Sequence, residues 1–172
     1  MLNIALGTKR GGYSMYTCRK ANFEDLSKIC DFPISEEEVF FMSPKLQYPL
    51  TVDHFNEVIK DRMNQTTIEY NGEICGFASV YNVENNNKCW LGTVIVSPSF
   101  RNKGAAEFLV KDIIRVVEKE LSIKELHLVC HNINTRGLMF YSRLGFTPYE
   151  IEKRITPSGE IFAAIKMKLE LG

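Results

Sequence analysis

Hydrophobic and polar residues follow two different periods along the chain, and each change of period marks a predicted element. In the middle of the chain, apolar residues recur at helical spacing, at Phe108, Leu109, Ile113, Val116, Val117 and Leu121. This spacing predicts an amphipathic helix that begins near Gly104. Shorter runs rich in β-branched and aromatic residues predict strands over residues 66–70, 73–81 and 89–97. Asn71-Gly72 lies between the first two and favours a type I′ turn, hence a tight hairpin.

Weaker patterns complete the N-terminal part of this order. We expect a short strand over residues 15–19, a helix capped by Asn22, and a second helix that starts at Thr51 or Asp53. Residues 32–50 are predicted to be irregular because prolines interrupt them. The side chains expected to be buried by the second helix are Phe55, Val58, Ile59 and Met63.

The C-terminal part predicts a return to strands. Residues 85–87 are three asparagines and are expected to form a turn. A strand over residues 126–130, a short helix over 134–143 and a final strand pair over 146–155 and 161–169 follow the long helix. A strand, a helix and another strand in succession imply one parallel crossover. We therefore predict an α+β fold, with a mixed, mainly antiparallel sheet of about six to seven strands flanked by helices.

Length and charge narrow the organisation and the partners. A chain of 172 residues fits one domain, which we place over residues 15–172, with residues 1–14 as a loose N-terminal extension. Its 21 basic and 21 acidic residues cancel, so no overall field attracts nucleic acid or an anionic membrane surface. No apolar run approaches the ~20 residues that span a bilayer. We expect neither a nucleic-acid nor a membrane partner.

The cysteine and histidine patterns argue against a metal site. The five cysteines are Cys18, Cys30, Cys75, Cys89 and Cys130. An odd number at wide spacing favours reduced thiols in the cytoplasm over a disulfide framework or a zinc site. His127 and His131 would share one face of a strand but lie ~13 Å apart, too far for one metal ion. Cys130 and His131 would point to opposite faces, which argues against a cysteine–histidine catalytic pair.

The turn between the third predicted strand and the long helix carries the strongest candidate chemistry. Gly104, Ala105 and Ala106 open the helix, where the first N–H groups lack partners and carry partial positive charge. No side chain there would block a phosphate, and Arg101 and Lys103 add positive charge. This arrangement predicts a pyrophosphate cradle, although close helix packing explains the small residues equally well. The spacing fits neither a Walker loop nor a three-glycine dinucleotide fingerprint.

Two motifs at the right separation resemble those of the GNAT superfamily of N-acetyltransferases. The family's loop signature R/Q-x-x-G-x-G/A is matched by Arg101, Gly104 and Ala106. Its second pattern, N-x-x-A/G-x-x-x-Y-x-x-x-G-F, is matched by Asn134, Gly137, Tyr141, Gly145 and Phe146. Residues 19–26 also look like the family's first strand and helix, so the resemblance covers about residues 15–170. It implies a GNAT-like fold and acetyl-coenzyme A as co-substrate.

The resemblance further implies where the coenzyme would bind. Its pyrophosphate would meet, with Arg101 alongside, the backbone N–H groups of Asn102, Lys103, Gly104, Ala105 and Ala106. Its pantetheine arm would pair with the backbone of Val94, Ile95 and Val96, and an N–H near Ile95 or Val96 would polarise the thioester carbonyl. Asn134 would contact the coenzyme or its loop.

The resemblance also implies a general acid but leaves the general base unassigned. Tyr141 holds the position where the family often places the acid for the departing thiolate. Many members carry a glutamate near the position of Thr93, which cannot act as a base at neutral pH. Glu84, Glu73 and His131 are other candidates, and no motif favours any of them. Water chains, or an acceptor whose amine has a lower pKa, would serve instead.

Together these features predict an N-acetyltransferase that moves the acetyl group of acetyl-coenzyme A directly to a primary amine of a small molecule, a peptide or a protein. The alternative is a non-catalytic module that binds acyl-coenzyme A as a sensor or scaffold, and the threonine at position 93 gives it weight. Residues 40–42 and 48–50 fall where the family lines its acceptor pocket, and core packing explains them equally well. The final strand pair, residues 146–169, is a candidate surface for a homodimer. The acceptor and the oligomeric state stay open.

Overall fold

A seven-stranded mixed sheet organises the described part of the chain. The computed structural model describes residues 15–84, 87–156 and 158–172, so the expected extension over residues 1–14 and most of the asparagine turn lie outside it. The strands are β1 (Tyr16–Lys20), β2 (Met63–Tyr70), β3 (Glu73–Glu84), β4 (Lys88–Val96), β5 (Glu125–His131), β6 (Thr147–Ile155) and β7 (Ile161–Glu170). Their spatial order is β1-β2-β3-β4-β5-β7-β6. Among these pairs β4–β5 is parallel and the others are antiparallel, which confirms the predicted fold class.

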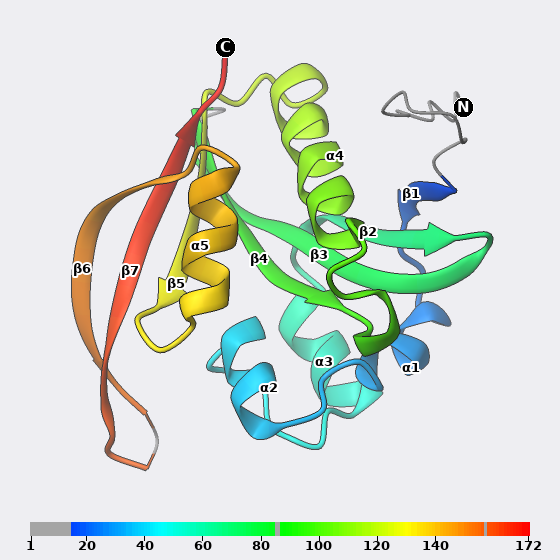
Figure 1. Ribbon diagram of the computed structural model, residues 1–172, viewed down its shortest axis with the longest axis horizontal. Helices are drawn as coiled ribbons and strands as arrows, with labels where there is room; N and C mark the ends of the chain where they lie inside the picture. The colour runs from blue at the N-terminus through cyan, green and yellow to red at the C-terminus, as the bar shows by residue number, and fades with distance from the viewer. Residues whose placement is uncertain (1–14, 85–86, 157) are drawn as a thin grey trace.

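Helices cover both faces of this sheet. They are α1 (Asp25–Cys30), α2 (Glu36–Met42), α3 (Val52–Ile59), α4 (Ala105–Lys119) and α5 (Thr135–Arg143). One face is covered by α4 and α5, and α1, α2 and α3 lie on the other (Figure 1). The two apolar layers meet the sheet through alternate residues of β3 and β4, so Ala78 and Val96 join the α4 layer, and Phe77 and Ile95 join the other.

Local sequence signals account for most of these elements. Asn71 and Gly72 both have positive φ, 54° and 82°, as the predicted type I′ hairpin requires. The Thr51 hydroxyl accepts a hydrogen bond from the His54 amide and caps α3, which confirms the predicted helix start. The expected burial of Met63 on that helix is wrong, because the chain turns after Ile59 and Met63 instead begins β2 at 47% exposure.

The helix α2 was not predicted from the sequence. It lies within residues 32–50, the region that was expected to be irregular. The Ser35 hydroxyl caps it by accepting from the Glu38 amide, and three consecutive glutamates, residues 36–38, occupy its positive N-terminal turn. A helix of seven residues between prolines gives too short a periodic pattern to be recognised.

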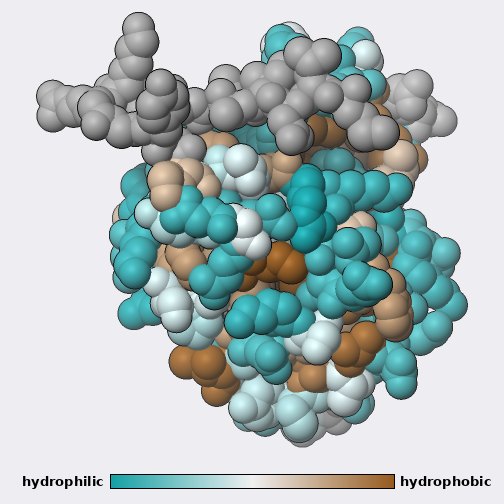
Figure 2. Space-filling view, turned by 90° about the vertical axis from the view of Figure 1, so that its right-hand side faces the viewer, coloured by the Kyte–Doolittle hydropathy of each residue, from teal (hydrophilic) through white to brown (hydrophobic). Residues whose placement is uncertain are grey.

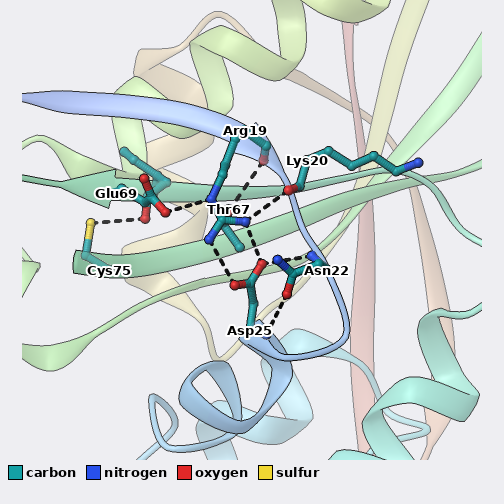
Figure 3. Close-up of polar contacts among 8 residues, drawn as sticks. Arg19, Lys20, Asn22, Asp25, Thr67, Glu69 and Cys75 are labelled. Carbon is teal, nitrogen blue, oxygen red and sulfur yellow. Dashed lines mark hydrogen bonds and ion pairs between the residues drawn. The ribbon is translucent and has the colours of Figure 1, made fainter. Parts of the chain in front are cut away.

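An ion-pair cluster fastens β1 to α1 and β2 (Figure 3). The Arg19 guanidinium donates two hydrogen bonds to the Asp25 carboxylate, at 2.7 and 2.9 Å, and its Nε donates to Glu69 at 2.7 Å. Asn22 and Asp25 also bond each other reciprocally: the Asn22 amide donates to the Asp25 carboxylate, and the Asp25 amide donates to the Asn22 side chain. The Asn22 side chain bonds the first helical amide, but α1 starts at Asp25 with Glu24 at its N-cap position, so the predicted helix start at Asn22 lies two residues too early.

Two surface properties bear on partners. The β1 side of the molecule presents mainly hydrophilic side chains, with apolar ones in small separate areas (Figure 2). In the part of the chain that the structure describes, no helix combines the length and the apolar character that crossing a membrane would require.

We predict that Asp25→Asn lowers the free energy of unfolding by about 1–3 kcal/mol, because it removes the charge-assisted bonds of a buried carboxylate. The Arg19 hydrogen bonds are the main cause of the lowered pKa of Asp25, so this carboxylate is ionised at neutral pH. Urea unfolding monitored by circular dichroism measures the change. Glu57→Gln is the control, because it breaks only an exposed pair with Lys60 and should leave the stability nearly unchanged. Equal losses in the two variants would contradict the prediction.

Candidate active site

The parallel strands β4 and β5 separate toward their carboxyl ends. They pair over three positions, from Lys88 opposite Glu125 to Trp90 opposite His127. Beyond that point β4 continues to Val96 and β5 to His131, and the two diverge (Figure 1). The separation leaves the backbone groups on this edge of β4 without strand partners on β5. Ligands of α/β sheets commonly bind at the carboxyl ends of such strands.

A bulge in β4 increases this separation. Between the pairs Phe77–Ile95 and Ser79–Gly92, β3 advances two residues and β4 advances three. The extra residue on β4 bends the strand, and Thr93 takes a φ of 51° there. Its buried hydroxyl is 2.7 Å from that of Ser79, which holds the bulge against β3.

The hydrogen-bond phase after the bulge shows which backbone groups of β4 face the opening. The Ser97 amide donates to the Cys75 carbonyl at 2.8 Å, so Ser97 faces β3. Successive residues of an antiparallel strand alternate, and Val96 therefore directs its N–H and C=O away from β3 and toward the separation. Its carbonyl accepts from Arg101 Nε at 3.1 Å. Ile95, in contrast, directs its backbone N–H and C=O toward β3.

The turn before α4 presents unpaired amides to a groove. Gly104 precedes α4 at a φ of 85°, and no side chain caps the helix. Within the described residues, none of the amides of residues 102–106 donates a hydrogen bond to the protein itself. A Cβ on Gly104 would meet nothing within 4 Å. The adjoining groove measures about 530 Å³ and lies between this turn and α5. The amides and the space both fit a diphosphate.

Arg101 lies at this groove but is mostly engaged with the protein. Its Nη atoms donate to the Glu38 carboxylate at 2.6 and 2.9 Å, and Nη2 also donates to the Phe32 carbonyl at 3.3 Å. Burial raises the pKa of Glu38, but its hydrogen bonds, chiefly the one from Arg101, outweigh this effect and leave the pKa below the usual value. The positive charge expected beside the pyrophosphate is therefore largely balanced by Glu38.

Two other arginines bring positive charge to the same groove. Arg136 and Arg143 line it from α5, and neither forms an ion pair with a carboxylate in the described part of the chain. Sequence reasoning missed both. Their spacing of seven residues on a predicted helix, which puts them on one face, was the available signal. Lys103 does not line the groove; its carbonyl accepts a hydrogen bond from the Tyr16 hydroxyl at 3.0 Å.

A second hollow, which we call the β4–β5 cleft, lies where the strands separate. It measures about 360 Å³, and its walls include Thr93 and Val94 of β4 and His131 of β5. Asn134 and Tyr141 reach it from the α5 layer, and Phe41 and Met42 reach it from the α2 layer. Side chains from both faces of the sheet thus meet in the opening. The cleft is lined by β4 as far as Val94, and the groove is lined by Val96, two residues further along the strand.

Tyr141 keeps its proton at neutral pH. It is partly covered by Phe140 and Phe146, with ring centroids at 5.1 and 5.8 Å, and burial raises the pKa of its phenol well above the usual value. A protonated phenol in the cleft can donate a proton or a hydrogen bond. The Asn134 side chain serves the fold, because it caps α5 by accepting from the Gly137 amide at 2.9 Å.

His131 is the cleft residue with an unsatisfied polar atom. Its ring packs against Phe40 and Phe162, with centroids at 4.4 and 4.8 Å, and its Nδ1 has no hydrogen-bond partner within the described residues. Burial, assisted by the charge of Arg154, lowers the pKa of His131 to about 4, so its imidazole is neutral at pH 7. The neighbouring Cys130 packs into the α5 layer instead, and burial raises its pKa to about 11.

The cleft walls contain no carboxylate among the described residues. Glu84 pairs with Lys88 at 3.1 Å, and Glu73 opens β3 beside the hairpin turn. Neither borders the cleft, so of the three base candidates only His131 does. No group of three or more His, Cys, Asp or Glu side chains in the described ranges is placed to hold a metal ion.

Comparisons with known proteins agree with this geometry. Residues 27–146 match the Acetyltransferase (GNAT) family. The chain is 27% identical over 149 residues to an amino-acid acetyltransferase of Aeromonas salmonicida, covering 86% of this chain and 30% of that protein. The chain therefore spans about a third of the length of this curated relative.

Solved structures share the fold. yncA of Salmonella typhimurium, solved with its cofactor acetyl-CoA, has a TM-score of 0.70 at 18% identity, over 92% of this chain and 95% of that one. The ribosomal-protein-S18-alanine N-acetyltransferase of Escherichia coli has a TM-score of 0.69 at 21% identity, again over 92% and 95%. At these identities the likeness concerns the fold.

We predict that acid destabilises the protein through His131. Because the pKa of His131 is lowered to about 4, the unfolded chain binds a proton at higher pH than the folded one. The neutral imidazole therefore contributes to the free energy of unfolding. This contribution is fully present above pH ~6.5 and is lost as the pH falls toward 4. Between pH 7 and 5 the wild type should lose on the order of 2 kcal/mol more than His131→Asn.

Chemical unfolding at both pH values measures the difference. His54→Asn, outside the cleft on α3, should follow the wild type. If His131→Asn loses as much stability as the wild type over this interval, the buried neutral imidazole is excluded as the cause.

Proposed function

The chain belongs to the acetyltransferase (GNAT) family, and on that premise we propose that it transfers the acetyl group of acetyl-coenzyme A directly to a primary amine. The proposal rests on two adjacent features. The amides of residues 102–106 bond no acceptor among the described residues, and the open edge of β4 leads from them to the β4–β5 cleft. The diphosphate of the coenzyme binds the amides, its extended pantetheine arm binds the strand edge, and the thioester then lies in the cleft.

We propose the following positions for the coenzyme. Its diphosphate accepts hydrogen bonds from the amides of residues 102–106, with Arg136 and Arg143 supplying most of the charge. Arg101 holds the turn in place through Glu38 and lends its remaining donor. The pantetheine arm pairs with the edge of β4 formed by Val94 and Val96, while Ile95 contributes through the strand rather than through its own amide. Asn134 supports the site by capping α5.

The same geometry supports assignments for the chemical step. The acceptor nitrogen forms a bond to the thioester carbon, and the carbon–sulfur bond breaks. The Val96 amide, which faces the opening, donates to the carbonyl oxygen as negative charge develops on it. The Tyr141 phenol gives its proton to the departing thiolate. The proton of the acceptor amine leaves through water, because the cleft offers no described carboxylate and His131, with a pKa of about 4, is a weak base.

The names of the relatives do not choose an acceptor. One names an amino acid and another the N-terminal alanine of a ribosomal protein. Acceptors this different share a primary amine, and the proposal extends to that class. The alternative is a non-catalytic module that binds acyl-coenzyme A, which the threonine at position 93 would suit. Thiol release from acetyl-CoA across a panel of amines separates the two: binding without acceptor-dependent release would favour the module.

Two further parts of the proposal concern the cellular compartment and the oligomeric state. The thiols of all five cysteines are free, which supports a reducing compartment such as the cytoplasm. The outer strand β6 and the start of β7 expose Ile151, Ile155 and Ile161 at 62–70%, which supports a homodimer formed through this edge. Size-exclusion chromatography with light scattering tests the second part; a monomer at micromolar concentration would oppose it.

We predict that Gly104→Val weakens acetyl-CoA binding at least tenfold, because the side chain enters the phosphate groove and strains a residue at a φ of 85°. Isothermal titration calorimetry measures the change. Gly159→Val is the matched control, with a φ of 89° and equally open space on the β6–β7 turn. It should alter the affinity less than twofold. Unchanged affinity in Gly104→Val would remove the groove as the diphosphate site.

We predict that Tyr141→Phe lowers kcat by 10²–10⁴-fold, because the thiolate then departs without a proton donor. The dissociation constant for acetyl-CoA should change less than threefold, since the ring and its packing remain. Steady-state thiol release and calorimetry give the two values. Phe140→Leu, in the adjacent position on α5, controls for helix packing. A kcat in Tyr141→Phe that matches the wild type would show that this phenol is not the acid.

A further inference from the structure

The β4–β5 cleft is rich in positive charge, and one of its cations pairs with no carboxylate of the described residues. Arg62, Arg154 and Lys166 line it. Arg154 donates to Glu152 at 2.8 Å, and Lys166 pairs with Glu152 and, at 3.1 Å, with Glu150. Hydrogen bonds from Lys166 and Arg154 hold the pKa of Glu152 at about 2. Arg62 has no carboxylate partner among the described residues.

The Arg62 side chain is nevertheless partly buried. It lies between α3 and β2, and its Nη1 donates weakly to the hydroxyls of Ser79 and Thr93, at 3.3 and 3.5 Å. Its guanidinium stacks on the Tyr81 ring, with Cζ 4.8 Å from the centroid. Burial lowers the pKa of Arg62, and an arginine stays charged under such conditions. A desolvated charge with only neutral partners leaves a strong site for an anion.

The backbone of β4 is shaped to receive this side chain. A Cβ on Gly92 would lie 2.6 Å from Arg62 Nη1 and 2.8 Å from Tyr81 Cε1. Only a residue without a side chain therefore allows the guanidinium and the ring to rest against the strand here. Gly92 directly precedes the bulge residue Thr93, so the charge lies next to the part of β4 where the thioester is placed.

We propose that Arg62 binds a carboxylate of the acceptor, so that the acceptor is a small amine that also carries a carboxylate group. The inference rests on the proposed function and specifies the acceptor of that same cleft. The carboxylate accepts hydrogen bonds from the Arg62 guanidinium beside Tyr81, and the amine lies toward Tyr141 and Val94. The neutral His131 ring forms part of the cleft wall on the other side. A volume of about 360 Å³ suits a free amino acid better than a folded partner.

Matched acceptors test this assignment without any variant. Free amino acids and their carboxamides, such as glycine with glycinamide and alanine with alaninamide, differ in the charge that Arg62 would bind. Thiol release from acetyl-CoA should show a KM at least tenfold lower for the acids. Tripeptides with neutral side chains, which place their carboxylate far from the amine, should be poor acceptors. Carboxamides or such peptides used as well as free amino acids would overturn the proposal.

Variants then separate anion binding from support of the bulge. Arg62→Met should raise the KM of the amino acids at least tenfold and leave the KM of the carboxamides within twofold, and Arg62→Lys should lie between. Lys60→Met, an exposed lysine two residues away, is the charge-matched control and should behave as wild type. A fall in kcat for acids and amides alike, with unchanged KM, would mean that Arg62 only supports Thr93 and would overturn the assignment.

A binding measurement distinguishes failure here from failure of the proposed function. N-acetylglycine and N-acetylglycinamide, the two products, are added to the protein saturated with coenzyme A, and the melting temperature is recorded. Stabilisation by the acid alone, lost in Arg62→Met, supports the carboxylate site even where no thiol is released. The absence of stabilisation by the acid, with coenzyme binding intact by calorimetry, overturns it. Absence of coenzyme binding contradicts the proposed function itself.

Discussion

The ion pair between Glu38 and Arg101 is the contact on which the site depends. It joins α2, on one face of the sheet, to the turn that precedes α4, on the opposite face. The same guanidinium also bonds the carbonyls of Phe32 and Val96, so a single side chain fixes two layers and the end of β4. Because the turn is held through its side chain, its amides at residues 102–106 are left without internal acceptors. Firm positioning and unsatisfied donors thus come from one interaction.

The candidate site also requires an open strand edge inside the sheet. The bulge at Thr93 provides this edge. Without the extra residue, β4 would stay in register with β3 and continue alongside β5. With it, β4 turns away after Trp90, and Val96 keeps its amide available while its carbonyl bonds Arg101. A strand edge normally lies at the border of a sheet. Here it lies at the centre, next to His131 of β5, where α5 supplies Tyr141 from one face and α2 supplies Phe41 and Met42 from the other.

Much of the fold could be predicted because local chemistry specified it. Asn71-Gly72 fixed a hairpin, Thr51 fixed a helix start, and the small residues from Gly104 marked the turn before α4. The assignments to residues 94–96, 101–106, 134 and 141 remain proposals. The ion pair of Arg101 with Glu38 and the position of Arg62 could not be predicted, since both depend on partners remote in sequence: Glu38 lies 63 residues from Arg101, and Arg62 contacts Tyr81 and lies against Gly92. Likewise, a helix as short as α2 is decided by its packing rather than by its own period.

The thiols have a consequence for a protein that would handle a reactive thioester. Burial raises the pKa of Cys30 and Cys130 to about 11 and that of Cys75 and Cys89 to about 12, and it raises the pKa of Cys18 as well. Only the thiolate form attacks a thioester or reacts readily with peroxide. With five protonated thiols, the protein would be a poor target for acylation by the proposed co-substrate, and its cysteines would react slowly with oxidants and alkylating agents.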